Sequence, residues 1–533
     1  MTVRIIAVFG ALCLIVSAAL GQGRNVRISQ AGGSPEEVSI AINPANPDNI
    51  IAGANIRYYY WSFDGGKTWG QSQLPTITYG DPCVAFGPDG RGYYAHLTNG
   101  WDAITVRTSD DGGRTWSSGV KLRGPSSDSA KPGSFFRSSL QDKEWLVTDL
   151  SNSAHRGNVY ATWTDFTKYG STNPRDSSVI VFARSTDRGD SFEPFVRISD
   201  RGGDARDDDA TVEGAVPAVG PEGEVYVAWS GSDGLYFDRS FDGGGTWGVD
   251  KVITATPGGW VIDIPGVNRC NGLPVTVCDI SSSVHRGTIY VNWVDSRNGD
   301  HDVFIVKSTD RGDTWSPPIR VNDDAVGNGR EQFFTWAAVD PVTGELVIVF
   351  YDRRAYAGDS TDVYLARSFD GGATFRNECI SEAAFFPTAN VFMGDYNGIS
   401  AYNGRIRPIW TRLHDGLLSI HTHLLDSTIT AREPVPAPGE GLLLDPYPNP
   451  VTMASNFEST LRVRLDAAGE MDLAVYDMMG RRVQLLARGW MQAGEHAVAF
   501  RGASLAPGMY VCQLSHIREA GWAGASALLT VMK

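Results

Sequence analysis

An eight-residue phrase that occurs six times constrains what this chain can fold into. The first copy runs from Ser62 to Trp69 and reads S-F-D-G-G-K-T-W. Every copy has Ser first, Asp third, Gly fifth and an aromatic residue last, and the others begin at Ser109, Ser185, Ser240, Ser308 and Ser368. Copies spaced by roughly 50 to 75 residues indicate a repeat architecture, and such a period is typical of propeller blades.

The phrase has the chemistry of a tight turn between two strands. Asp at the third position can accept hydrogen bonds from backbone N–H groups of its own turn, and Gly at the fifth can adopt a positive φ. The closing Trp or Phe can pack against a neighbouring sheet. We therefore expect the six Asp residues to fix turns and not to perform chemistry.

The pattern S-x-D-x-G-x-T-W resembles the Asp box, or BNR repeat, of the sialidase-like propellers. The resemblance implies an all-β propeller built from four-stranded antiparallel blades. The sequence between the phrases agrees with this, because short apolar strands such as 158–163, 224–229 and 288–293 recur with the period-2 patterning of sheets.

The number of blades follows from the two ends of the repeat region. After the sixth phrase, residues 398–402, 406–410 and 418–423 repeat three strands, and no seventh phrase follows. Residues 25–29 match the strands that follow the phrases elsewhere, such as 195–199. An N-terminal strand that completes the last blade would close the ring and leave no long open edge. We predict seven blades, with six, the number in known sialidases, as the alternative.

The chain's length, charge and N-terminus bound its class. A chain of 533 residues exceeds one ordinary core, so at least two domains are expected. A net charge of −15 argues against nucleic acid or an anionic membrane surface as a partner. Residues 1–21 have the short positive region, apolar stretch and small-residue end of a secretory signal, and no later stretch is apolar and long enough to span a bilayer.

The five cysteines beyond the signal segment allow one short disulfide. Cys270 and Cys278 could close a loop in an oxidising compartment. Cys83, Cys379 and Cys512 have no obvious partner, so we expect buried free thiols.

A smaller unit follows the repeat region. Residues 431–441 are rich in proline and are interpreted as a linker, and 442–533 read as a small β-rich domain. The ordered phrases 447–450, 474–481, 494–496 and 505–510 resemble the C-terminal sorting domain of the type IX secretion system, an immunoglobulin-like β-sandwich. This implies export across an outer membrane, with the tail cleaved or anchored, and secretion machinery as a partner. A simple immunoglobulin-like accessory module is the alternative. The propeller then spans 22–430, and the location is secreted or cell-surface.

Strand order determines which loops share a face of the propeller. The phrases are turns between third and fourth strands, so the loops between second and third strands, and those between blades, lie on the opposite face. Propellers commonly bind ligands in the central funnel. Loops of this face carry Arg297, Arg353, Arg354 and Arg412. They also carry Glu36, Glu37, Asp81, Asp142, Lys143, Glu144, Asp207, Asp208, Asp209, Glu213, Gln332, Asp395 and Tyr396.

These residues allow a sialidase-like hypothesis. Arginines in the funnel could clamp a carboxylate bidentately. By resemblance to sialidases, Tyr396 would be the nucleophile, Glu144 or Glu213 its helper, and Asp81 or Asp395 the acid/base. The chain lacks the Arg-Ile-Pro tripeptide that usually carries the first sialidase arginine. The alternative is that each arginine forms a salt bridge within its own loop and that the acids cap backbone N–H groups.

No cofactor is predicted, although calcium is possible. The stretch 207–209 with Glu213, and the group Asp295, Asn298, Asp300 and Asp302, are rich in oxygen ligands. Neither fits a known calcium loop, and solvated acidic loops are the alternative.

Three functions remain open. The protein could be a sialidase-like, exo-acting glycoside hydrolase on extracellular glycans or glycoproteins, a non-catalytic module that binds glycan or protein, or a lyase-type enzyme. A pocketed tyrosine with converging arginines would favour an enzyme. Arginines already paired to Asp295, Asp352 or Asp415 would favour binding.

Overall fold

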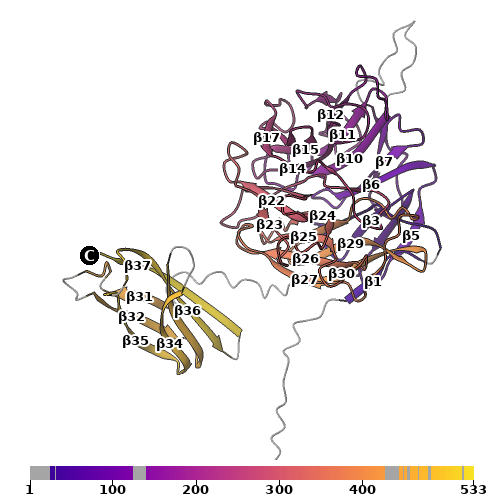
Figure 1. Ribbon diagram of the computed structural model, residues 1–533. Helices are drawn as coiled ribbons and strands as arrows, with labels where there is room; N and C mark the ends of the chain where they lie inside the picture. The colour runs from indigo at the N-terminus through magenta and orange to yellow at the C-terminus, as the bar shows by residue number, and fades with distance from the viewer. Residues whose placement is uncertain are drawn as a thin grey trace, which may run out of the picture. The chain divides into compact units, whose positions relative to one another are not determined.

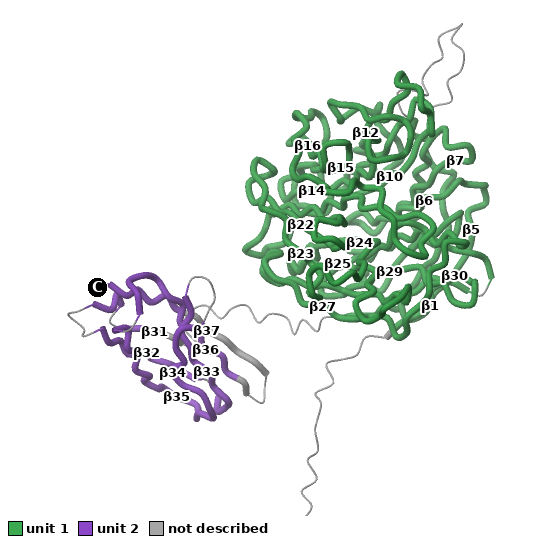
Figure 2. Tube along the Cα trace, in the orientation of Figure 1, with its two compact units in different colours: residues 1–427 green, residues 428–533 purple. Residues whose placement is uncertain are grey.

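The computed structural model describes residues 24–30, 32–123, 140–426, 443–447, 449–452, 457–465, 467–477, 482–503, 505–518 and 521–532 (Figure 1). Two compact units result, residues 1–427 and residues 428–533 (Figure 2). The predicted signal peptide 1–21 and linker 431–441 lie outside the described residues. In the parts that are described, no helix is long and apolar enough to cross a membrane.

The first unit contains seven four-stranded antiparallel sheets among its described residues. The first strands are β2 (Val38–Ile42), β6 (Thr78–Phe86), β10 (Leu140–Thr148), β14 (Glu213–Val219), β20 (Val275–Cys278), β24 (Gln332–Val339) and β28 (Gly398–Tyr402). The second strands are β3 (Ile50–Ala54), β7 (Gly92–Thr98), β11 (Val159–Phe166), β15 (Val225–Gly231), β21 (Ile289–Asp295), β25 (Leu346–Asp352) and β29 (Arg405–His414).

The outer strands complete each blade. The third strands are β4 (Tyr58–Ser62), β8 (Ile104–Ser109), β12 (Ser178–Ser185), β16 (Gly234–Ser240), β22 (Asp302–Ser308), β26 (Asp362–Ser368) and β30 (Leu417–Asp426). The fourth strands are β5 (Gly70–Gln73), β9 (Val120–Leu122), β13 (Val196–Arg197), β17 (Lys251–Thr254), β23 (Ile319–Arg320), β27 (Arg376–Cys379) and β1 (Arg24–Arg27). In Figure 1, first strands such as β10, β14 and β24 lie toward the middle of the unit, and β5, β17 and β27 lie toward its rim.

The N-terminal strand closes the ring. β1 pairs antiparallel with β30, and Asn25 lies opposite His423. The Ile28 N–H donates to the Ile420 carbonyl at 2.8 Å, and the Ile28 side chain is buried with Val38 and Ile409. The predictions of an all-β propeller, of seven blades and of closure by the N-terminal strand are confirmed.

The six repeated phrases form the predicted turns. In the first, Asp64 Oδ1 accepts the backbone N–H of Thr68 at 2.9 Å, and Oδ2 accepts the Thr68 hydroxyl at 2.6 Å. The Gly66 N–H donates to the Ser62 hydroxyl at 2.9 Å, and Gly66 has φ 93°. The other five copies repeat these hydrogen bonds. Each Asp is therefore occupied in fixing its own turn.

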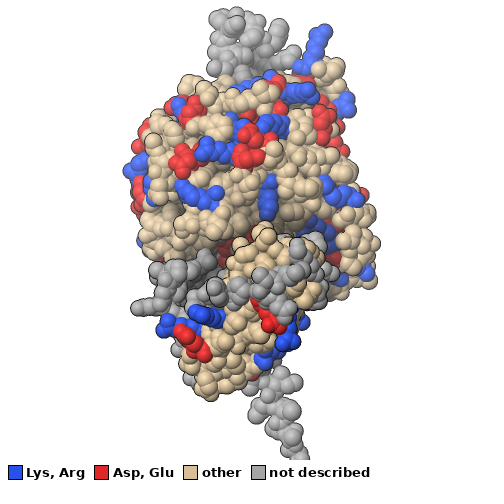
Figure 3. Space-filling model, turned by 90° about the vertical axis from the view of Figure 1, so that its left-hand side faces the viewer, with Lys and Arg blue, Asp and Glu red and all other residues tan. Residues whose placement is uncertain are grey.

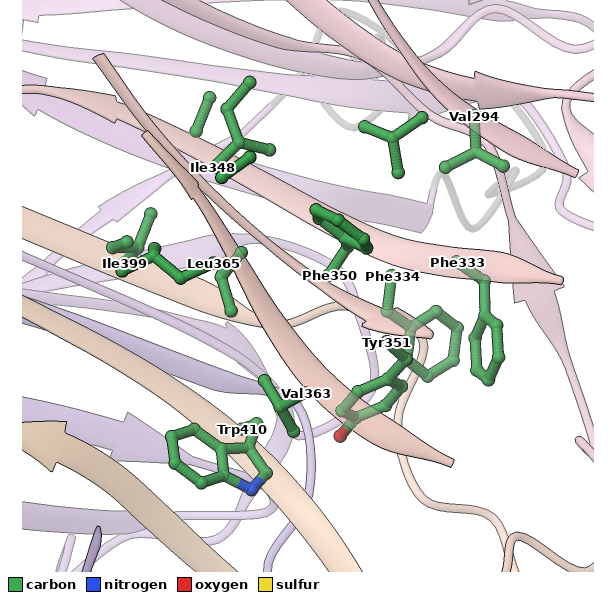
Figure 4. Close-up of a cluster of buried hydrophobic side chains, with 14 of the residues drawn as sticks. Val294, Phe333, Phe334, Ile348, Phe350, Tyr351, Val363, Leu365, Ile399 and Trp410 are labelled. Carbon is green, nitrogen blue, oxygen red and sulfur yellow. The ribbon is translucent and has the colours of Figure 1, made fainter. Parts of the chain in front are cut away.

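Apolar side chains fill the space between neighbouring blades. Figure 4 shows part of the largest cluster, in which Val294 of β21, Ile348 of β25 and Trp410 of β29 come from three blades. Four second strands bury a tryptophan at a corresponding position: Trp163, Trp229, Trp293 and Trp410. Such large side chains dominate core energetics, so the repeated tryptophan stabilises each blade against its neighbour.

The second unit is a two-sheet sandwich. One sheet contains β31 (Leu443–Tyr447), β32 (Glu458–Leu465) and β35 (Gly494–Arg501), and the other contains β34 (Arg482–Met491), β33 (Gly469–Asp477), β36 (Gly508–Arg518) and β37 (Gly521–Val531). Leu461, Phe500, Leu473 and Leu514 from both sheets share one buried core. The predicted sandwich is confirmed, whereas its role as a sorting domain stays a prediction.

The cysteines differ in part from expectation. Cys270 and Cys278 are both free, so the possible disulfide between them is not formed. They lie on separate strands, β19 (Cys270–Asn271) and β20. Cys83 and Cys512 are buried as expected, but Cys379 is exposed because it ends the outermost strand β27.

Candidate functional site

A cavity of about 630 Å³ lies among the loops of the predicted ligand face. Its polar wall contains seven carboxyl groups and two cations: Glu36, Glu37, Asp81, Asp142, Asp207, Glu213, Asp395, Lys143 and Arg269. Its aromatic wall contains Tyr79, Trp101, Tyr169, Trp260 and Phe392. A smaller pocket of about 40 Å³ shares Asp81, Lys143, Asn271 and Asp395 with the cavity and also contains Glu144 and Tyr396.

Strained backbone positions hold the rim of this cavity. Glu37, Asp81 and Lys143 of this cavity have φ values of 49°, 55° and 50°, and Phe334 of the smaller pocket has 51°, which residues with a side chain rarely adopt. At β6, β10, β14 and β24 the pairing with the neighbouring strand shifts register near this point. A bulge of this kind re-aims a side chain at a rim or site. Such conformations cost about 1–3 kcal/mol each, and they persist where the surroundings over-determine them, as at functional sites.

Asp395 is the counter-ion of both cations. Lys143 Nζ lies 2.6 Å from Asp395 Oδ1, and an Arg269 guanidinium nitrogen lies 2.6 Å from Asp395 Oδ2. Burial alone would raise the pKa of Asp395, but Lys143 and Arg269 hold it below its ordinary value. Asp395 is therefore a fixed carboxylate, and nothing in this geometry equips it to donate a proton.

Two carboxyl pairs lie on the polar wall. Burial raises the pKa of Glu37 well above its ordinary value, and repulsion from Asp81 and Asp395 and a hydrogen bond with Asp81 add to the effect. Burial raises the pKa of Glu213 in the same way, followed by repulsion from Asp207 and Asp142 and a hydrogen bond with Asp207. Each pair therefore places a buried glutamic acid with a raised pKa beside an aspartate.

The neighbours of each pair favour this arrangement. Asn55 donates its side-chain amide to Glu37 Oε2 and accepts the Asp81 N–H at 2.8 Å. The Tyr169 hydroxyl donates to Asp207. No group among the described residues donates a hydrogen bond to Glu213 Oε2, and Glu213 is only 2% exposed. A buried carboxyl oxygen without a donor is less costly when the group is protonated, which agrees with the raised pKa.

Tyr396 and Glu144 lie in the smaller pocket. Tyr396 is 7% exposed, and Lys143 Nζ lies 4.6 Å from the centre of its ring. Burial, then the negative charges of Asp81 and Glu37, raise the pKa of Tyr396 well above its ordinary value. Burial likewise raises the pKa of Glu144, and neither of its carboxyl oxygens has a partner among the described residues. The proposed nucleophile is thus beside carboxyl groups, but it does not line the larger cavity.

The four predicted arginines are not brought together at this cavity. Arg297 Nε bonds Asp295 Oδ1 at 2.9 Å, and Arg354 Nε bonds Asp352 Oδ2 at 2.8 Å. Arg353 donates to the Pro265 carbonyl at 2.8 Å, and Arg412 lies on β29.

The expected convergence on the funnel is therefore wrong, because loop aspartates bind Arg297 and Arg354 locally. This is the alternative that the sequence left open for these loops.

Sequence reasoning missed the arginine that does line the cavity. Arg269 belongs to an insertion, residues 255–274, which contains β18 (Val261–Ile262) paired with β19. Asp209 holds it by accepting the backbone N–H groups of Trp260 and Val261 at 2.8 and 2.9 Å. The unusual length of this connection between blades was the available signal, since long ordered loops are often functional.

The aromatic wall also escaped prediction. Tyr79 and Trp101 pack edge to face with ring centres 4.1 Å apart, and Trp101 contacts Tyr169 at 5.1 Å. Tyr79 is 51% exposed, so this wall is accessible. These residues follow no spacing in the sequence, because Tyr79 lies on β6 and Trp101 and Tyr169 lie in loops of two different blades.

The acidic stretch considered for calcium contacts backbone N–H groups. Among the described residues, no group of three or more His, Cys, Asp or Glu side chains is arranged to hold a metal ion. In the stretch considered for calcium, Asp209 binds backbone N–H groups, and Asp208 accepts the Ala210 N–H at 3.0 Å. These contacts match the capping alternative.

Comparisons with known proteins give distant structural likenesses. No family model matches the chain, and no curated protein matches it. The Hadza microbial sialidase Hz136 is 13% identical, with 72% of this chain and 75% of that chain covered and a TM-score of 0.41. The NanB sialidase of Streptococcus pneumoniae is 11% identical, with 71% and 83% covered and a TM-score of 0.41.

A polysaccharide lyase is also similar. This ulvan lyase is 9% identical, with 84% of this chain and 91% of that chain covered and a TM-score of 0.36. Likeness at these levels carries no argument about activity, which has to come from the site.

Proposed function

We propose that the protein is a glycoside hydrolase that acts on extracellular glycans and that the 630 Å³ cavity is its active site. The observation that carries this proposal is the presence of two hydrogen-bonded Glu–Asp pairs, Glu37 with Asp81 and Glu213 with Asp207, in one aromatic-walled cavity. Glycoside hydrolysis requires one carboxyl group that is protonated near neutral pH and a second that is ionised. Burial and repulsion raise the pKa of Glu213 and so supply the protonated carboxyl group, and we assign the second role to Asp81.

Glu213 is the acid in this proposal. Its raised pKa keeps a proton that it can give to the glycosidic oxygen as the bond from that oxygen to the anomeric carbon breaks. Asp81, from the other pair, takes a proton from water, and the resulting hydroxide adds to the anomeric carbon. Exchange with solvent then removes the proton from Asp81 and returns one to Glu213. The aromatic wall provides apolar surface for the sugar rings.

The remaining predicted residues have supporting roles. Asp395, Lys143 and Arg269 form a fixed ionic frame, and Tyr396 packs beneath Lys143. A tyrosine nucleophile would have to reach the cavity past that lysine. We therefore assign Tyr396 a positioning role and retain Asp81 and Glu213 as the catalytic pair.

A non-catalytic glycan-binding module is the second candidate. The specific observation in its favour is that Arg297 and Arg354 are already paired with Asp295 and Asp352, so they have no free donor fork for a substrate. Aromatic walls and carboxyl groups would bind a sugar equally well without turnover.

The first prediction separates these candidates. Purified full-length protein should release reducing ends from a panel of neutral, anionic and amine-bearing oligosaccharides. Glu213→Gln and Asp81→Asn should each lower kcat by about 10²- to 10⁴-fold, because each removes one proton-transfer group, while substrate affinity changes less.

The control is Asp110→Asn, which alters a carboxylate that is 73% exposed on the face with the repeated turns. It should leave kcat unchanged. Turnover that survives both site substitutions would contradict the assignment, and glycan binding without turnover by the unsubstituted protein would establish the second candidate.

We also propose that the protein is exported. The motifs of residues 1–21 and 442–533 support this, and its location would be secreted or cell-surface.

A further inference from the structure

The cavity has an excess of acidic groups that its own cations do not balance. Lys143 and Arg269 both contact Asp395, and Arg269 also lies 3.4 Å from Glu37. Among the described residues, no ion pair involves Glu36, Asp81, Asp142, Asp207 or Glu213. Five carboxyl groups of the wall thus lack an ion-pair partner, whereas both cations of the wall are already paired and offer an anionic ligand no free charge.

Asp142 is one of the carboxyl groups without an ion-pair partner, and other carboxyl groups of the wall repel it. The pKa of Asp142 is raised by burial and then by repulsion from Asp81 on one side and Asp207 on the other, although Lys143 and Arg269 partly oppose the effect. Asp142 lines the same cavity as the two carboxyl pairs. Glu213 also lines the cavity, and its buried Oε2 has no hydrogen-bond donor among the described residues. Such a site is stabilised when a positive charge enters.

This charge excess differs from the outer surface. On the face that Figure 3 shows, Lys and Arg side chains are interspersed with Asp and Glu. An overall net charge of −15 alone does not require seven carboxyl groups in one cavity. The concentration of negative charge therefore belongs to the site.

The chain itself shows how an ammonium group binds here. Lys143 Nζ lies 2.6 Å from a carboxylate oxygen of Asp395 and 4.6 Å from the ring centre of Tyr396. Arg269 repeats the combination, with Asp395 at 2.6 Å and the Phe392 ring centre at 5.0 Å. Carboxylates with aromatic faces are the chemistry that recognises organic cations. The larger cavity offers the same two components to a ligand, in Asp142, Asp207, Tyr79 and Tyr169.

We infer that the cavity takes a sugar with a free, protonated amino group, and that Asp142 and Asp207 receive the ammonium group. This inference takes from the proposed function only the assumption that the ligand is a glycan. The preference for a positive charge follows from the residues of the cavity. An N-acetylated sugar lacks the charge, and a uronic or sialic acid carries the opposite one.

Calorimetric titration of the full-length protein tests this inference. The probes are a β-1,4-linked glucosamine tetramer, the matched N-acetylglucosamine tetramer and a galacturonic acid tetramer. The glucosamine tetramer should bind more tightly than the N-acetylated tetramer by roughly 10- to 100-fold, because it gains a charge-assisted hydrogen bond and a cation–π contact. The anionic tetramer should bind least.

Asp142→Asn should remove most of this preference while leaving the affinity for the N-acetylated tetramer within a few-fold of its original value. Asp110→Asn, remote from the cavity, should change neither affinity. Equal affinity for the two tetramers would overturn the inference, and so would a preference that survives Asp142→Asn. Tight binding of tetralysine without binding of the glucosamine tetramer would also overturn it, because the ligand would then be a cationic peptide.

The outcomes distinguish this inference from the proposed hydrolase. Selective binding of the glucosamine tetramer without cleavage would support the charge preference and refute the hydrolase. Cleavage of the neutral tetramer with no preference in binding would support the hydrolase and overturn the charge preference.

Discussion

The raised pKa of Glu36 should make the free energy of unfolding depend on pH. Its pKa is raised to about 8, chiefly by burial, with Asn55 opposing the shift through a hydrogen bond and Asp81 adding repulsion. A carboxyl group with a raised folded-state pKa stabilises the fold fully below its unfolded pKa. That contribution is lost as the pH rises through the folded value.

The free energy of unfolding should therefore decrease between about pH 4.5 and pH 8. Glu36→Gln should flatten this decrease by at most about 1.4 kcal/mol per unit of pKa difference. Urea unfolding across this range, followed by tryptophan fluorescence, measures it. The exposed Glu222→Gln is the control, and identical pH slopes for Glu36→Gln and the unsubstituted protein would contradict the prediction.

Single residues also show what the sequence could predict at the site. The sequence could place Asp81, Glu213 and Asp395 on the ligand face. The repeated strand order of the blades shows which loops share a face, and this needs no knowledge of contacts. Whether Asp395 is an acid or a counter-ion depends on Lys143 and on Arg269, more than a hundred residues earlier in the chain. That distinction is three-dimensional, and no local pattern contains it.

Strand β1 is short, but it completes the last blade and so closes the propeller. It is four residues long, and with the following Ile28 it completes the blade of β28, β29 and β30. Ile28 is 3% exposed in a core shared with Val38, Ile409 and Ile420. The strand could be predicted because its sequence resembles the strands after the repeated phrases.

Ile28→Ala should therefore lower the free energy of unfolding by about 2–5 kcal/mol, the usual cost of such a truncation in a core. The exposed neighbour Gln30→Ala should cost far less. Urea unfolding of both variants gives the comparison. Equal midpoints would mean that β1 does not contribute to the core as described.

The insertion with β18 and β19 was not predicted, and the reason is physical. Its two strands have two residues each, too few for alternation to be detectable, and their position depends on Asp209 of a distant loop. Elements that repeat seven times could be derived from the chain, whereas the one that occurs once could not.

For the whole molecule, the propeller and the sandwich have separate cores. The core of the second unit contains residues of that unit only, such as Leu461 and Leu514. Removal of residues 442–533 should therefore leave the unfolding midpoint of the propeller within the error of measurement. Calorimetry of the full chain and the truncated chain checks this, and a large loss of propeller stability would refute it.

The same truncation tests export. If the C-terminal sandwich is a sorting signal, the truncated protein should disappear from the cell surface and the medium while staying folded inside the envelope. Fractionation of the producing cells measures this. An unchanged distribution would refute the sorting role.

Closure of the ring by β1 also determines when the molecule can finish folding. Asn25 pairs with His423, so the first and last strands of the propeller are joined only after nearly all of the unit has been synthesised. Contacts this far apart in the chain require loop closure at high entropic cost and form slowly. If the chain is exported from its N-terminus, as we propose, the ring can close only after nearly the whole propeller has crossed the membrane.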